Sequence, residues 1–119
     1  MEGTERVGRL LAGWRRQLGA AGWRTMARNV VSHPIREFMH ADPFTLRAYS
    51  KPRGYAGDAV MMDYIYGHLR ESLAAPIDDV FRYTTQVGVA PRGVRERRQI
   101  LGRAIDEVAA TLGRPIDVI

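Results

Sequence analysis

The residues from Lys51 to Asp58 are the densest group in this chain that could do chemistry. Their sequence is Lys-Pro-Arg-Gly-Tyr-Ala-Gly-Asp, and Asp58 stands where the next helix is expected to begin. A glycine-rich loop that leads into a helix can present backbone N–H groups to an anion. The charge of Asp58 opposes a phosphate there, and no lysine follows the glycines as in a P-loop. On local physics alone, the simpler interpretation is a tight turn whose Tyr55 packs into the core.

A metal site is the second chemistry to consider. His33 and His40 are seven residues apart and would share a face of a continuous helix. Pro34 and Pro43 interrupt such a helix, and the nearest third ligand, Asp42, is better explained as a helix cap. The chain has no cysteine, which excludes thiolate ligands, disulfides and a cysteine nucleophile. We therefore expect no metal.

The bulk composition predicts one folded domain. The chain has 119 residues, of which 45% are hydrophobic and 26% charged, as in ordinary globular proteins. No segment approaches the roughly 18 apolar residues that span a bilayer. The N-terminus has no apolar stretch of the kind found in signal peptides. We expect a cytoplasmic protein without a membrane span.

The net charge of +5 raises the question of nucleic-acid binding. All the basic residues except Lys51 are arginines, and most are scattered along the chain. Only the stretch from Arg92 to Arg103 is dense, and Glu96 interrupts it. Because nucleic-acid binding needs basic side chains gathered on one face, it is not the preferred interpretation.

The elements on both sides of the loop are predicted to be helices. Residues 1–31 have apolar side chains at helical spacing, and Gly19 and Gly22 predict a break between two helices. Pro34 and Pro43 each favour the start of a short helix, because proline is tolerated at the first helical position. After the loop, a helix is expected with the apolar stripe Val60, Met61, Tyr64, Ile65 and Leu69.

The last third of the chain predicts two more helices and a strand. One helix opens at Pro76, and a turn is expected over Gly88–Gly93. A long helix then runs from Val94 to a glycine cap at Gly113. The β-branched residues of 116–119 are typical of a strand, which would lack a partner, so the chain is expected to be truncated.

The stretch from His33 to Gly67 resembles the N-terminal region of a bacterial family of class I S-adenosylmethionine-dependent methyltransferases. These are described as extracellular-factor (3-hydroxypalmitic acid methyl ester) biosynthesis proteins. The run Lys51–Asp58 is the most specific part, and residues 81–86 and 94–98 also resemble the family. The similarity covers most of the chain from about residue 30.

This resemblance implies a helical cap segment that precedes a Rossmann-like core. The expected divisions are an N-terminal helical segment at 1–31, a cap region at 32–113, and the first strand of the core from 114 to 119. The complete protein would use S-adenosylmethionine to methylate a small-molecule acceptor. One hypothesis for this acceptor is the carboxylate of a fatty acid. This chain alone is expected to bind no cofactor and to be inactive.

Within the cap, the resemblance makes loop 51–58 the candidate contact with the substrate and cofactor pocket. Arg53 would hold an acceptor carboxylate with two hydrogen bonds, and Tyr55 would contribute its ring or hydroxyl. Gly57 belongs to the same candidate set, and Asp58 would serve as a helix cap or a polar contact. The catalytic residues are not identified.

Two alternatives stay open beside the methyltransferase hypothesis. In the first, the chain is a self-standing helical binding or regulatory module that uses its basic helix at 92–112. In the second, it self-associates to cover an exposed apolar surface.

Overall fold

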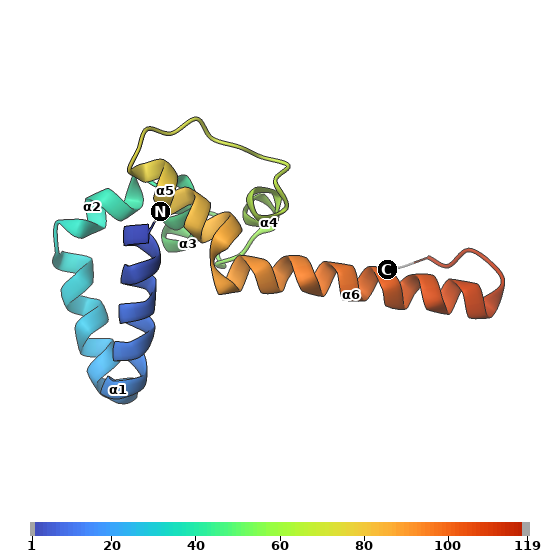
Figure 1. Ribbon diagram of the computed structural model, residues 1–119, viewed down its shortest axis with the longest axis horizontal. Coiled ribbons are helices and arrows are strands. Elements are labelled where there is room, and N and C mark those ends of the chain that lie inside the picture. Colours follow the sequence, from blue (N-terminus) through green and yellow to red (C-terminus); the bar gives the residue numbers. More distant parts are fainter. Residues whose placement is uncertain (1, 118–119) are drawn as a thin grey trace.

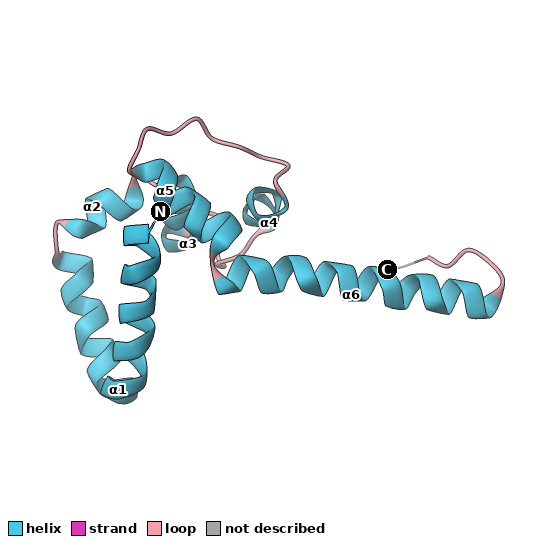
Figure 2. Ribbon diagram, in the orientation of Figure 1, coloured by secondary structure: helices cyan, strands magenta, loops and turns pink. Residues whose placement is uncertain are grey.

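The computed structural model describes residues 2–117, and within that range every regular element is helical (Figures 1 and 2). This confirms the prediction of a mostly α fold. The elements in chain order are α1 (Glu2–Ser32), α2 (Ile35–His40), α3 (Pro43–Ser50), α4 (Ala59–Tyr66), α5 (Ile77–Arg82), the π-helix η1 (Tyr83–Val87) and α6 (Val89–Leu112).

The first element, α1, is a helical hairpin (Figure 1). Gly19 leaves the helical conformation with φ of 61° and ψ of −175°, which only glycine adopts readily. The two arms lie side by side, and the guanidinium of Arg15 lies 5.9 Å from the ring centroid of Trp23 across the turn. The predicted break is confirmed at Gly19, whereas Gly22 remains helical.

The core lies where α3, α4 and α5 meet. Its buried hydrophobic side chains are Met61, Tyr64, Ile65, Val80 and Phe81. The ring of Tyr64 meets that of Phe81 edge to face, with centroids 5.4 Å apart. Its hydroxyl donates to Glu71 Oε1 at 2.6 Å, and this hydrogen bond, with burial, raises the pKa of Tyr64 to about 12.

Of the five side chains in the predicted apolar stripe of α4, three are buried, Val60 is half-buried and one is exposed. Met61, Tyr64 and Ile65 are buried, but Leu69 is 42% exposed. The helix ends at Tyr66, because Gly67 adopts a left-handed conformation with φ of 77°. Leu69 therefore follows the helix and does not continue its stripe.

Asp42 joins two parts of the fold. Its carboxylate accepts hydrogen bonds from the backbone N–H of Phe44 (3.2 Å) and Thr45 (3.1 Å), as expected of the cap of α3. It also accepts from the hydroxyls of Thr45 and, from η1, Thr84. Asp42 is fully buried, so the residue that sequence offered as a third metal ligand is a structural cap.

The predicted turn over Gly88–Gly93 is wrong. Gly88 alone separates η1 from α6, which begins at Val89. Pro91 lies buried in the first turn of α6, where the missing N–H of proline has no helical partner to lose. The predicted cap at Gly113 is confirmed, since its N–H donates to the carbonyls of Ala109 and Ala110.

Beyond α6, Ile116 and Asp117 have no regular secondary structure. The other half of the predicted strand, residues 118–119, lies outside the described residues. A strand needs a neighbouring strand for its backbone hydrogen bonds, and residues 2–117 contain no strand. Across the same residues, no helix combines the length and apolarity needed to cross a membrane.

Candidate functional site

Loop 51–58 is fixed at both ends by helix caps. At its start, Lys51 adopts a left-handed conformation with φ of 47°, and its N–H donates to the carbonyl of Arg47 at 3.0 Å. At its end, Asp58 caps α4 by accepting the N–H of Met61 at 3.2 Å. Gly54 and Gly57 have φ of 82° and 106°, as their residue type predicted.

A partly buried ion pair ties the loop to α3. Nε of Arg47 donates to both carboxylate oxygens of Asp58 at 2.9 Å, and Nη2 donates to Oδ2. Asp58 is 1% exposed. These hydrogen bonds, donated by Arg47 and accepted by Asp58, lower the pKa of Asp58 and raise the pKa of Arg47. We call this pair the Arg47–Asp58 clasp.

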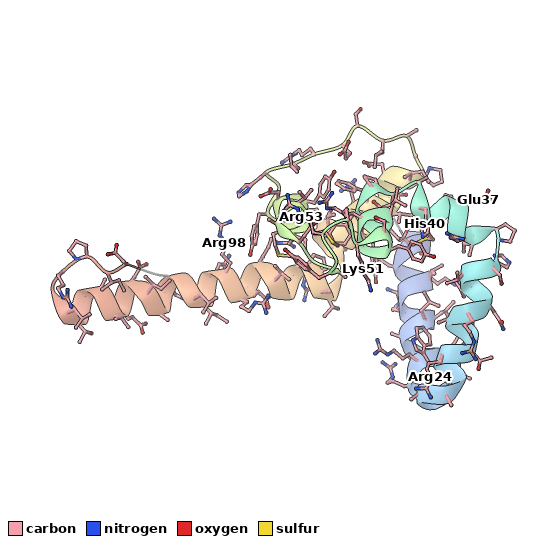
Figure 3. The ribbon with its side chains drawn as sticks, turned by 180° about the vertical axis from the view of Figure 1, so that it is seen from behind. Arg24, Glu37, His40, Lys51, Arg53 and Arg98 are labelled. Atoms are coloured by element: carbon pink, nitrogen blue, oxygen red, sulfur yellow. The ribbon has the colours of Figure 1, made fainter. Side chains whose placement is uncertain are left out.

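The clasp divides the predicted site residues into two groups. Asp58 faces inward and is a cap and an ion-pair partner, so its carboxylate is already occupied. Arg53 and Tyr55 face outward, and Tyr55 is 55% exposed. Figure 3 shows Arg53 on the loop beside α4, with Lys51 at the start of the same loop. The positive charge of Arg53 also helps to lower the pKa of Asp58.

The interpretation that Tyr55 packs into the core is wrong. Tyr55 is 55% exposed, and the core contains Tyr64 instead, whose ring contacts those of Phe44 and Phe81. The left-handed turns at Gly54 and Gly57 keep the loop at the surface. The outcome is an exposed, cationic and aromatic loop on a fixed base, and this combination suits a small anion.

The histidines have local roles. Nδ1 of His33 accepts the N–H of Ile35, the first residue of α2, at 3.1 Å, while the ring of His40 lies 4.6 Å from that of Tyr49. His68 lies beside Asp63, with 3.4 Å between Nδ1 and Oδ1. Residues 2–117 contain no group of three side chains that could hold a metal ion.

An apolar cavity of about 500 Å³ lies apart from the loop. Its walls come from α1, α2, α5 and η1 and include Val7, Ile35, Phe38, Val80 and Tyr83. No residue of loop 51–58 is among the described residues that line it. An acceptor held by Arg53 would therefore not extend into this cavity, and the structure does not join the predicted arginine to an apolar groove.

The low pKa of Asp58 predicts acid sensitivity. The folded-state pKa lies below the ordinary value of 3.8, so the clasp contributes stability that is present above about pH 4 and is lost as the pH falls through the lowered pKa. Urea unfolding measured between about pH 5 and pH 2 should show this decline. Asp58→Asn keeps the size of the side chain and should flatten it; an unchanged slope would contradict the assignment.

Compared with known proteins, the chain matches no protein-family model, no curated protein and no solved structure.

Proposed function

We propose that this chain is the helical cap region of an S-adenosylmethionine-dependent methyltransferase, and that loop 51–58 binds the carboxylate of a small-molecule acceptor in the cytoplasm. One observation carries the proposal. Arg53 and Tyr55 are exposed on a loop that the Arg47–Asp58 clasp holds in place.

The chemistry of methyl transfer is consistent with such a loop. The reaction needs the nucleophilic oxygen, the methyl carbon and the sulfur in line, so positioning the acceptor is the main task. A guanidinium can take a carboxylate with two parallel hydrogen bonds, which fixes its orientation as well as its location. A loop with fixed ends places Arg53 with little loss of conformational entropy on binding.

The cofactor would not be held by these helices. A Rossmann-like site needs a strand, a glycine-containing loop and a helix in sequence, and residues 2–117 contain no strand. We expect the chain alone to bind no S-adenosylmethionine in a calorimetric titration. Micromolar binding would overturn the proposal that this chain is inactive by itself.

The acceptor-binding role is tested by titrating the ¹⁵N-labelled chain with octanoate and, separately, with octanol. Octanoate should shift the amide signals of residues 51–57, and octanol should not, because it offers no carboxylate. Arg53→Gln should weaken octanoate binding about tenfold, which is the effect of losing about 1.4 kcal/mol. Arg70→Gln, an exposed arginine in a different loop, is the matched control. Equal losses in the two variants would contradict the proposal.

A second candidate function, a helical binding module, is favoured by α6. This helix projects from the body of the protein (Figure 1), and its Leu101, Val108 and Leu112 are each about half exposed. Exposed apolar side chains in a row on one helix are typical of an interaction surface.

A further inference from the structure

The projecting part of α6 has the sequence pattern of a coiled coil. Residues spaced by four and three in alternation form one seam along it, and they are apolar except for Arg98: Val94, Arg98, Leu101, Ile105, Val108 and Leu112. Next to this seam stand the small residues Gly102, Ala104 and Ala109, which let another helix approach closely. The pattern predicts a helical partner of matching length.

The seam remains accessible in the folded chain. Leu101, Val108 and Leu112 are 56%, 49% and 50% exposed. Residues 114–117 turn back after Gly113 (Figure 1), and Ile105 is only half-buried. Most of the seam is therefore open to solvent along the outer half of the helix.

The charges along α6 favour an antiparallel partner of the same sequence. Its first part carries four arginines and one glutamate, at Arg92, Arg95, Arg97, Arg98 and Glu96. Its second part carries two acids and one arginine, at Asp106, Glu107 and Arg103. Two antiparallel copies place the basic half of each helix beside the acidic half of the other, whereas parallel copies place like charges together.

The seam also selects a register. When the two-fold axis crosses the helices at the level of Arg103, Leu101 meets the partner's Ile105, and Arg98 meets the partner's Val108. Arg98 therefore does not face a second Arg98, as it would in a parallel pair, and Glu107 directly precedes the Val108 that it meets. A charged residue at a single seam position is a known means of setting orientation, because only one arrangement gives it a partner.

A groove in the chain fits the end of the partner helix in this register. The groove has a volume of about 680 Å³ and lies between Tyr66 of α4 and the seam of α6, where its walls include Arg98, Leu101 and Ile105. The guanidinium of Arg98 lies 4.6 Å from the ring centroid of Tyr66. Figure 3 shows Arg98 on α6 near this junction with the body. The partner's Val108 and Leu112 would enter here.

We propose that α6 pairs with α6 of a second copy as a two-fold, antiparallel helix pair. The overlap from Val94 to Leu112 is roughly 28 Å long, at 1.5 Å per residue, and a helix is about 10 Å wide. Such a footprint is small compared with the roughly 1,200 Å² of stable interfaces. The dimer is therefore weak and forms with a Kd in the micromolar range or above. This inference does not depend on the proposed methyltransferase role.

Sedimentation equilibrium of the full chain over a hundredfold range of concentration tests the dimer. The average mass should rise from 13.4 kDa towards twice that value. Leu101→Lys should weaken association at least tenfold, because it places a charged side chain against the apolar Ile105 of the second copy. Val89→Lys, which removes an 83% exposed side chain at the start of the same helix, should have no effect. A single mass of 13.4 kDa at all concentrations would overturn the proposal.

Charge reversal tests the register. Glu107→Arg should weaken association, and Arg98→Glu combined with Glu107→Arg should restore it, because the pair is re-formed with exchanged signs. Arg103→Glu makes a charge change of the same size on the outer face and should have little effect. A double variant that associates less well than either single variant would contradict the antiparallel register.

Cysteine cross-linking distinguishes antiparallel from parallel pairing, since the chain has no native cysteine. In the proposed register, Ala104→Cys lies beside its own copy near the two-fold axis and should form a disulfide under mild oxidation. Leu112→Cys lies about 27 Å from its own copy, at 1.5 Å per residue over 18 residues, and should not cross-link. Efficient cross-linking of Leu112→Cys, with none of Ala104→Cys, would overturn the antiparallel arrangement.

Discussion

Asp58→Ala should lower the thermal unfolding midpoint of this chain by roughly 10 °C, because it removes one partner of a partly buried ion pair. The carboxylate is 1% exposed and accepts three hydrogen bonds from Arg47 and one from the N–H of Met61. Its removal leaves the guanidinium of Arg47 next to a cavity and uncaps α4. Circular dichroism at 222 nm during heating measures the change.

The matched control is Asp63→Ala, which removes an acid from the same helix. Asp63 is 44% exposed in its side chain, and its contact is the 3.4 Å approach to His68. Exposed ion pairs contribute little, so the midpoint should move by no more than about 2 °C. Similar losses in Asp58→Ala and Asp63→Ala would show that the clasp is not a special feature of the fold.

A double-mutant cycle separates the pair from the cap. If the clasp is a coupled unit, Arg47→Met combined with Asp58→Ala should be no less stable than Asp58→Ala alone, because no unpaired charge remains. Additive losses would mean that the two side chains act independently. The cycle also bears on the proposed function, since a loop released from α3 should bind octanoate more weakly even with Arg53 intact.

The features that sequence predicted well are those with local causes. Asp42 and Asp58 cap helices because each side chain reaches an N–H three residues ahead, and Gly113 ends α6 because its own backbone allows a left-handed turn. The break at Gly19 has the same origin. In each case the residue and its immediate neighbours contain the whole physical reason.

The features that sequence did not predict depend on contacts between distant residues. Arg47 lies 11 residues before Asp58, on another helix, and only the cost of burying an unpaired carboxylate hinted that a cation must be near. Tyr55 was placed in the core because aromatic rings are usually buried, yet its side chain is 55% exposed. Helical spacing placed Tyr64 in the core correctly, whereas Tyr55 lies in a loop, where no such spacing indicates which side chains are buried.

At the start of α6, a local sequence signal predicted a feature that the structure does not have. Pro91 and Gly93 are turn-forming residues, and they predicted a turn that is absent. Tertiary contacts override that preference, because Pro91 is buried and Arg95, one turn later, binds the body of the protein. The side chain of Arg95 thus explains how the start of α6 is attached to the body.

Arg95→Met should destabilise the chain by about 2–3 kcal/mol, the cost of losing charge-assisted hydrogen bonds to backbone carbonyls. The Arg95 guanidinium donates to the carbonyls of Thr85 at 3.0 Å and Ile65 at 3.4 Å, and also to that of Gln86. These acceptors belong to η1 and α4, so a single side chain holds α6 against both. Chemical denaturation measures the loss, and hydrogen exchange should show that the amides of η1 lose protection first.

Arg95→Lys should recover less than half of that loss, because one ammonium cannot reach carbonyls on two different elements as a planar guanidinium does. Arg92→Met, an exposed arginine one turn earlier on α6, is the control and should change stability by less than about 0.5 kcal/mol. Full rescue by lysine would mean that only the positive charge of Arg95 matters and that the shape of the guanidinium does not. A loss in Arg92→Met equal to that in Arg95→Met would mean that α6 depends on its overall charge, and the three carbonyl contacts would then not explain its attachment.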